Sequence, residues 1–391
     1  MKKKLAILLC VVMASTVFLG GCKKTGVNTS ADKSSSDVIK IGVFEPMTGA
    51  NAAGGALEIE GIKLANKLYP TALGKKVELV LVDNKSDKSE AANAASRLVE
   101  KDKVTAIIGS WGSGYSMAAG PIIKQAKVPT VGTSCTNPLV TQGNDYYFRV
   151  CFIDPFQGTV MANYAYNELH AKKVAIVQEV SNDYAVGLAK FFTDSFKKLT
   201  GDEKAILSVS NYNTGDQDFT AQLTNIKAQN PDAIFAPGNF TESALVIKQA
   251  RQLGITVPII GGDTWETPEF IQIGKEAVEG ATFSTFFATE KPITKESEKF
   301  LTEYRKEYGG KEPAAVAALG YDAYLLLIDA LNRVGSVDSV KLRDELAKTK
   351  DFQGAAGVIN FDENRNAVKS AVIKEVKNGK FTFKEVIEPT K

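Results

Sequence analysis

The chain has 391 residues, of which 44% are hydrophobic and 24% are charged, and its formal net charge is +2. This length predicts two domains or one large one, and the composition is that of a soluble globular protein with a sizeable core. Because the charge is nearly balanced, we expect no basic face for binding nucleic acid.

The first 37 residues differ in composition from the rest. Three lysines at 2–4 precede an apolar run at 5–18, which is too short to span a membrane stably and is typical of a secretory signal peptide. Leu-Gly-Gly-Cys follows, ending at Cys22, and resembles a bacterial lipoprotein lipobox. The resemblance implies that residues 1–21 are removed and that Cys22 is lipidated; a plain signal peptide with a chance cysteine is the alternative.

Residues 22–37 are rich in Lys, Ser, Thr and Gly and lack an apolar period, which is typical of a flexible tether. Loss of the three leader lysines would change the net charge from +2 to −1. We therefore expect an extracytoplasmic protein, lipid-anchored at the outer face of the cytoplasmic membrane or in a periplasm.

From residue 38 onward, short apolar runs alternate with amphipathic segments. The expected strands are 38–44, 77–82, 104–108, 128–131 and 146–150, then 174–177, 205–210, 233–236 and 257–260. The expected helices are a first one ending near residue 68, then 86–102, 115–127, 156–169, 185–199, 217–229 and 241–253. This pattern predicts an α/β fold of parallel sheets with helices on both faces, arranged as two similar lobes.

After residue 286 the pattern changes. Helices are expected at 295–308 and 314–334, and short strands at 358–361, 371–376 and 381–386. The dipeptide Asn378-Gly379 predicts a tight hairpin between the last two strands.

The strongest indication of a binding site lies within residues 104–138. Two expected strands there each end in a loop of small and hydroxyl-bearing residues. Because the carboxyl ends of parallel strands meet at one edge of a sheet, Ser113 should lie beside Ser134 and Thr136. Hydroxyl and backbone N–H groups at helix starts bind small anions such as carboxylates. Ordinary helix caps and turns are the alternative interpretation.

Several kinds of chemistry are disfavoured. His170 is the only histidine, which argues against a Ser-His-Asp triad and against histidine metal sites. The glycines of 109–114 lack the spacing of dinucleotide-binding and phosphate-binding loops. Cys135 and Cys151 are the only cysteines beyond the leader, and could form one disulfide or remain two buried thiols. We expect no enzyme activity, no cofactor and no metal.

The segments IIGSWGSGYS and VPTVGTSCTNP, with the lipobox and the two α/β lobes, resemble the leucine/isoleucine/valine-binding protein family. These are type I periplasmic-binding proteins of ABC importers. Further matching stretches are IKIGVFEPMTG, YFRVCFIDPFQG, VAIVQEVSNDYAVGLA and DAIFAPGN, and the likeness covers residues 38–388. It implies two doubly wound parallel-sheet lobes joined by a three-crossing hinge. We place lobe 1 at 38–154 plus 288–352 and lobe 2 at 155–287 plus 353–391.

The resemblance also implies ligand-binding positions. They are Ser113, Ser134 and Thr136 for a carboxylate, Asp263 for an α-ammonium group, and Tyr184 and Tyr321 for the pocket wall; Trp111, from its loop, and Asn239, at a strand end, are further candidates. Each has a structural alternative: Asp263 could cap a helix near Thr267, and the aromatic side chains could belong to the core.

Two departures from the leucine-binding pattern bear on specificity. Where that pattern has an aromatic residue, this chain has Ala-Ala-Gly-Gly at 52–55, which predicts room beside the ligand side chain. Aspartate replaces the usual glutamate at position 263, which predicts a closer approach of the lobes or a bridging water. A branched-chain, larger apolar or aromatic amino acid is therefore expected.

The expected function is that of a monomeric, membrane-anchored solute-binding lipoprotein that delivers an apolar α-amino acid to an ABC permease and ATPase complex. One alternative is a receptor for an amide, urea or a small carboxylate, although Asp263 would repel an anion that lacks an amine. A sensor that signals to a membrane kinase or chemoreceptor is another. A remote alternative is an exported hydrolase with Ser113 or Cys135 as nucleophile, which lacks a histidine base.

Overall fold

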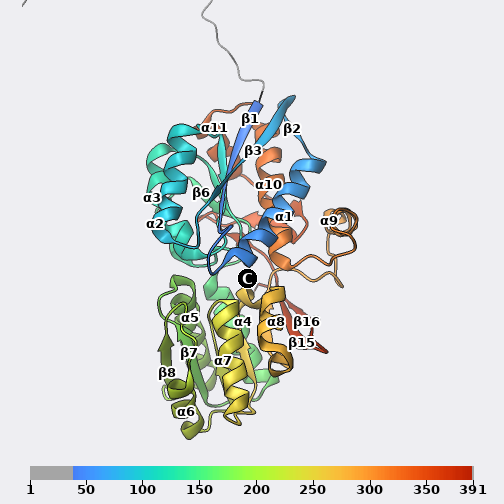
Figure 1. The fold of residues 1–391 in the computed structure, drawn as a ribbon. Coiled ribbons are helices and arrows are strands. Elements are labelled where there is room, and N and C mark those ends of the chain that lie inside the picture. The colour runs from blue at the N-terminus through green and yellow to red at the C-terminus, as the bar shows by residue number, and fades with distance from the viewer. Residues whose placement is uncertain (1–37, 390–391) are drawn as a thin grey trace, which may run out of the picture. The chain divides into compact units, whose positions relative to one another are not determined.

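The computed structural model describes residues 38–389 (Figure 1). The predicted signal peptide, the lipidation at Cys22 and the tether lie outside the described residues.

The first sheet has six strands in the order β2-β3-β1-β4-β5-β6. All neighbouring pairs are parallel except β2 with β3. Its strands are β1 (Val38–Glu45), β2 (Thr71–Ala72), β3 (Lys75–Asp83), β4 (Ala106–Ile108), β5 (Thr130–Gly132) and β6 (Tyr147–Arg149). The connecting helices are α1 (Ala52–Leu68), α2 (Lys88–Ser96) and α3 (Ser113–Ala126), and α2 continues into a π-helical turn, η1 (Arg97–Lys101). The alternation of strand and helix gives the parallel arrangement that the sequence predicts.

The second sheet has seven strands in the order β16-β15-β11-β10-β9-β7-β8. They are β7 (Val174–Glu179), β8 (Ile206–Tyr212), β9 (Ala233–Phe235), β10 (Ile259–Gly261), β11 (Thr282–Thr285), β15 (Ala371–Lys377) and β16 (Lys380–Ile387). The helices are α4 (Asp154–Asn163) with the π-helical turn η3 (Tyr164–Glu168), α5 (Asp183–Thr200), α6 (Thr220–Gln229), α7 (Phe240–Gln252) and α8 (Pro268–Gly274). Strands β7 to β11 are parallel, whereas β15 and β16 join as an antiparallel hairpin.

The hairpin turn is the one predicted from Asn378-Gly379. Both residues have left-handed backbones, with φ of 53° and 66°. Two consecutive positive φ values are what a type I′ turn requires, and Asn followed by Gly tolerates them at little cost.

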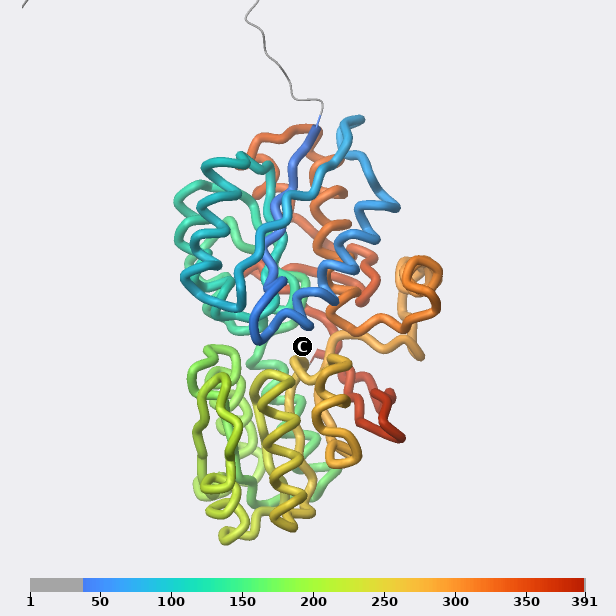
Figure 2. Tube along the Cα trace, in the orientation of Figure 1, coloured from blue at the N-terminus to red at the C-terminus, as the bar shows by residue number. Residues whose placement is uncertain are grey.

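The long helix α10 (Ala315–Val334) packs against α1, although the two are far apart in sequence (Figure 1). Figure 2 shows α1 in blue beside α10 in orange. The contact depends on two glycines: a Cβ on Gly61 would lie 1.8 Å from the carbonyl oxygen of Ala317, and one on Gly320 would lie 2.2 Å from that of Glu58. By length and hydropathy α10 could span a membrane, but 83% of its apolar window is buried, as in a core helix.

Further helices and a separate small sheet pack around α1 and α10. They are α9 (Lys295–Glu307), α11 (Ser339–Leu346) and a small sheet of β12 (Phe352–Gly354), β13 (Gly357–Phe361) and β14 (Ala367–Val368). The rings of Phe148 on β6 and Phe361 on β13 lie 5.4 Å apart, and Asp322 on α10 accepts a hydrogen bond from the N–H of Ala356 at 2.9 Å. These contacts hold residues 352–368 beside the first sheet, which favours a third passage of the chain between the lobes after residue 368 and not at 353. The predicted lobe limits stay predictions.

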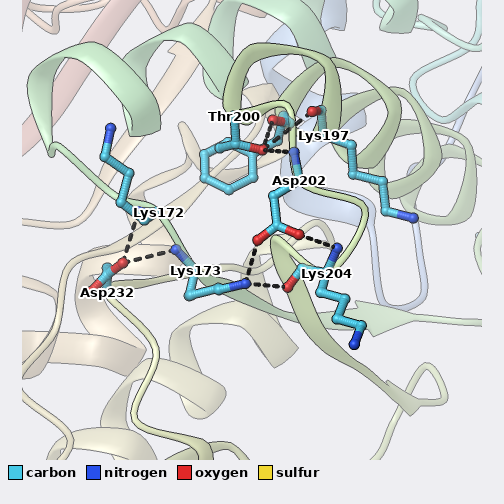
Figure 3. Close-up of polar contacts among 8 residues, drawn as sticks. Lys172, Lys173, Lys197, Thr200, Asp202, Lys204 and Asp232 are labelled. Carbon is cyan, nitrogen blue, oxygen red and sulfur yellow. Dashed lines mark hydrogen bonds and ion pairs between the residues drawn. The ribbon is translucent and has the colours of Figure 1, made fainter.

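The amino-terminal end of the second sheet is fastened by two aspartates (Figure 3). Asp232 accepts hydrogen bonds from the N–H groups of Lys172 and Lys173 at 2.7 and 2.8 Å. The ammonium group of Lys173 pairs with Asp202 and also donates to the carbonyl of Lys204 at 2.9 Å. The start of β7 is therefore held in place, which fixes where its other end, Glu179, emerges.

Candidate functional site

A cavity of about 260 Å³ lies where loops that follow strands of both sheets face each other. One wall comes from loops of the first sheet and from the start of α3, and the other from loops after β7, β8, β9 and β10. At its rim, Lys88 of α2 and Asp183 of α5 form an ion pair of 2.5 Å. The side chain of Asn137 also donates to the carbonyl of Asp183 at 2.9 Å. The two halves are thus in direct contact around the cavity.

Five of the eight predicted ligand-binding residues line this cavity: Trp111, Ser113, Ser134, Tyr184 and Asn239. The other three, Thr136, Asp263 and Tyr321, do not. The juxtaposition of residue 113 with residue 134 follows the topological expectation, since β4 and β5 are adjacent parallel strands.

Among the candidates, Ser113 is the best placed to donate a hydrogen bond into the cavity. It is the first residue of α3, and the turn before it is made by Gly112 with φ of 93°, which favours glycine. Its hydroxyl oxygen accepts a hydrogen bond from the N–H of Asn137 at 3.1 Å, so its own hydrogen is free to donate. The first N–H groups of a helix also lack partners within the helix, so this end of the cavity attracts a carboxylate.

Thr136 lies deeper than expected. Its side chain is fully buried, and its carbonyl accepts a hydrogen bond from the N–H of Asp154, the first residue of α4, at 3.0 Å. The residue therefore belongs to the crossing between the two halves, behind the cavity wall that Ser134 forms.

Asp263 is also behind the wall. Its carboxylate accepts hydrogen bonds from the side-chain nitrogen of Gln157 at 2.7 Å and from the hydroxyl of Tyr184 at 3.0 Å. Burial raises the pKa of Asp263 to about 6, against the lowering effect of these two bonds. It does not cap α8, because Thr267 does so. In this structure Asp263 reaches the cavity only through Tyr184, and its direct pairing with an ammonium group stays a prediction.

Tyr321 lies away from the cavity. Its hydroxyl donates to Glu296 at 2.6 Å, and its ring packs against Tyr69 and Phe300. The structure thus matches the alternative interpretation, in which Tyr321 is an aromatic packing residue of α10.

Two acids line the cavity, the exposed Asp87 that caps α2 and the buried Glu179, and the sequence analysis missed Glu179. It ends β7 and is fully buried. One carboxylate oxygen accepts from the N–H of Asn239 at 2.9 Å and the side chain of Asn182 at 3.0 Å, and the other accepts from the hydroxyl of Thr214. Several donors aimed at both oxygens indicate an ionised carboxylate. Within residues 38–389 no ion pair involves Glu179, so its charge lacks a protein cation. Its position at a strand end was the signal that could have found it.

Trp111 fills the space expected to be open. A Cβ on Gly54 would lie 2.5 Å from the indole nitrogen, so the indole occupies the place that a side chain at 54 would take. The indole also packs edge-on against Phe240, with ring centroids 6.2 Å apart. The prediction of extra room beside the ligand is therefore wrong: glycine at 54 admits Trp111 in place of a local aromatic residue.

Two further expectations concern cysteines and metals. Cys135 and Cys151 are both buried free thiols in this structure, so the open choice between a disulfide and two thiols resolves to thiols here. In the part of the chain from 38 to 389, no cluster of three His, Cys, Asp or Glu side chains is arranged to hold a metal ion.

Residues 38–380 match a family model described as periplasmic binding protein. The chain belongs to this family. A curated amino acid binding protein of Pseudomonas aeruginosa is 29% identical over 84% of this chain and 87% of its own length. A Leu/Ile/Val-binding protein homolog of Brucella melitensis is 28% identical, again over 84% of this chain and 87% of the relative.

Two solved structures are more similar still. The leucine binding protein LivK of Thermotoga maritima is 49% identical, with a TM-score of 0.86 over 90% of this chain and 99% of that protein. The branched-chain amino acid transporter substrate binding protein LivJ of Streptococcus pneumoniae, solved in complex with isoleucine, is 38% identical, with a TM-score of 0.84 over 90% of this chain and all of that one. These likenesses confirm the predicted two-lobe type I periplasmic-binding fold. The family consists of solute-binding proteins of transporters and not of enzymes, which removes the hydrolase alternative.

Proposed function

We propose that this protein binds a branched-chain α-amino acid, leucine or isoleucine, outside the cytoplasm and delivers it to an ABC importer. The single observation that carries the proposal is the polarity of the cavity. Hydroxyl and N–H donors lie on one wall, around Ser113, and the buried carboxylate of Glu179 without a protein cation lies on the other. A zwitterion satisfies both walls at once.

The proposed orientation of the ligand follows from these walls. The ligand carboxylate accepts from the hydroxyl of Ser113 and from N–H groups at the start of α3, and its ammonium group donates to Glu179. Charge-assisted hydrogen bonds in a site that excludes water are the strong kind. Trp111 and Tyr184 supply apolar surface for the side chain. A cavity of about 260 Å³ lies below the usual range of roughly 300–1,000 Å³ for ligand pockets, which favours one small amino acid.

Binding at this site also couples to closure. The donors come from one half of the protein and the acid from the other, so a ligand that touches both binds the closed form better and shifts the population towards it. The two similar proteins from Thermotoga maritima and Streptococcus pneumoniae support the choice of ligand, since their names state leucine and branched-chain amino acids.

Calorimetric titration with the twenty common amino acids, urea and small carboxylates tests this function. Leucine and isoleucine should bind with one site per chain. Acetate should not bind because Glu179 repels an anion that lacks an ammonium group, and urea should not bind because it is uncharged. Binding of urea or of an amine-free carboxylate in place of every amino acid would overturn the proposal.

We also propose that the mature protein is a monomeric lipoprotein anchored through Cys22, acting with a membrane permease and its ATPases. The lipobox supports the anchor. In the native host, Cys22→Ser should release the protein from the membrane fraction and abolish metabolic labelling with a fatty acid. An unchanged membrane fraction and unchanged labelling would contradict the anchor.

A further inference from the structure

Two fully buried carboxyl groups lie directly behind the wall that Ser134 forms. Glu45 is the last residue of β1, and Glu58 lies on α1; both are 0% exposed. Within residues 38–389 neither takes part in an ion pair. The hydroxyl of Thr133 lies between them, in hydrogen-bond contact with Glu58 and 3.5 Å from Glu45.

The contact that matters for the ligand is between Ser134 and Glu58. The hydroxyl of Ser134 donates to one oxygen of Glu58, and that of Thr133 donates to the other. A serine hydroxyl has one hydrogen. While Ser134 donates to an ionised Glu58, it presents only a lone pair to the cavity and cannot donate to a ligand carboxylate.

The surroundings of the pair disfavour two negative charges. Burial raises the pKa of Glu58 to about 8 and that of Glu45 well above its ordinary value, and the neighbouring carboxyl adds to the rise at Glu45. The other titratable groups that face the pair are the thiol of Cys135 and the phenol of Tyr147. The guanidinium group of Arg149 donates to the carbonyls of Cys135 and Asn137 and forms no ion pair with either carboxyl group.

The remaining elements around the pair bring no compensating cation. The loop after β4 contributes the N–H of Trp111, which donates to Glu45 at 2.6 Å, and the hydroxyl of Ser110 at 3.3 Å. Helix α10 meets Glu58 with the backbone of Gly320. Protonation, and not an ion pair with a described side chain, is therefore what can neutralise these two carboxyl groups.

We propose that Glu58 is a positioning residue for the ligand carboxylate: when protonated, it donates to Ser134 and turns the serine hydrogen into the cavity. The proton that Glu58 needs at alkaline pH comes from solvent, so ligand binding takes up a proton there. No bond other than this O–H forms, and the ligand stays a zwitterion. This inference rests on the proposed amino-acid site.

The test is calorimetry with leucine between pH 6.5 and 9 in pairs of buffers that differ in ionisation enthalpy. The wild type should take up no proton at pH 6.5 and a growing fraction of one proton above pH 8. Its affinity should fall by up to about tenfold per pH unit once the free protein has lost the Glu58 proton. Below that pH the affinity should be flat.

Two variants separate positioning from structure. Glu58→Gln keeps a donor for Ser134 and an acceptor for Thr133 at every pH, so it should bind leucine about as well as the wild type at pH 6.5. Up to pH 9 it should take up only the small fraction of a proton that the partly deprotonated amino group of free leucine needs, with only the matching small loss of affinity. Ser134→Ala removes the group that Glu58 orients, and should bind more weakly with no proton uptake beyond that same small fraction.

The outcomes are distinguishable. If Glu58→Gln takes up the same proton as the wild type, or if the wild type takes up none, the inference is overturned while the amino-acid site stands. If no amino acid binds the wild type at any pH, the proposed function itself fails. Should Glu58→Gln not fold, the comparison of wild type with Ser134→Ala alone decides, since persistent uptake in Ser134→Ala would also overturn the role.

Discussion

The substitution Glu179→Gln tests which acid pairs with the ligand ammonium group. The change removes one charge and keeps the shape. The amide oxygen can accept from the N–H of Asn239 and the side chain of Asn182, as the carboxylate does at 2.9 and 3.0 Å. The amide nitrogen then faces Thr214, whose hydroxyl can reverse and accept. These three hydrogen bonds therefore survive, the side chain of Asn239 loses only its long contact of 3.5 Å, and the charge is the main loss.

The expected loss of affinity follows from the environment of the pair. Two unit charges about 4 Å apart attract by about 4 kcal/mol at an effective dielectric constant near 20. No protein cation among residues 38–389 pairs with Glu179, so none competes with the ligand ammonium group for its charge. The cost of desolvating the ammonium group reduces the net contribution of the pair to about 3 kcal/mol. Loss of the charge should therefore weaken leucine binding roughly a hundredfold.

Asp263→Asn gives the competing assignment its own measurement. Asp263 reaches the cavity only through Tyr184. The Asp263→Asn substitution should therefore weaken leucine binding by no more than about tenfold, which corresponds to about one hydrogen bond that orients Tyr184. Glu242→Gln is the matched control, because Glu242 is a buried acid on α7, in the same half of the protein, that accepts from the N–H of Gly215 and does not line the cavity. Calorimetry at pH 7 measures all three. A hundredfold loss in Asp263→Asn with little change in Glu179→Gln would refute the assignment to Glu179.

Three other predictions concern packing and pH. Gly54→Ala should displace the Trp111 indole, which lies 2.5 Å from the added carbon, and so weaken leucine binding measured by calorimetry. Equal leucine affinity in Gly54→Ala and the wild type would contradict the importance of this contact. Trp111→Ala should shift the preference towards amino acids with larger side chains. Because burial raises the folded-state pKa of Glu58 to about 8, its contribution to stability is complete below the unfolded pKa and is lost as pH rises to about 8, by about 1.4 kcal/mol per pH unit for one proton. Urea unfolding between pH 5 and 9 should show this decline in the wild type and less of it in Glu58→Gln. Gly320→Ala should lower the free energy of unfolding by about 1–3 kcal/mol, because its carbon meets the α1 backbone at 2.2 Å. Gly120→Ala, also in a helix but with its nearest neighbour at 3.7 Å, should be neutral or stabilising.

The sequence by itself determined the order of strands and helices. It also determined that the cavity lies at the edge of the sheets where the parallel strands end. Period and turn chemistry are local properties, so the helix over 295–307 and the hairpin at Asn378-Gly379 could be predicted from neighbouring residues alone. Ser113 and Ser134 could be placed together because the connection between adjacent parallel strands allows one arrangement. The sequence analysis missed β2 and β11, because neither contains an apolar run like those that revealed the other short strands.

Only the tertiary structure decided which side chains face the cavity. The side chains of Gln157 and Tyr184, both remote in sequence from Asp263, hold its carboxylate behind the wall, whereas Glu179 lines the cavity. The indole that occupies the space over Gly54 likewise comes from another loop. Such choices depend on packing between segments far apart in the chain, where a shift of one side chain changes which polar group is left to bind, and no local pattern encodes that.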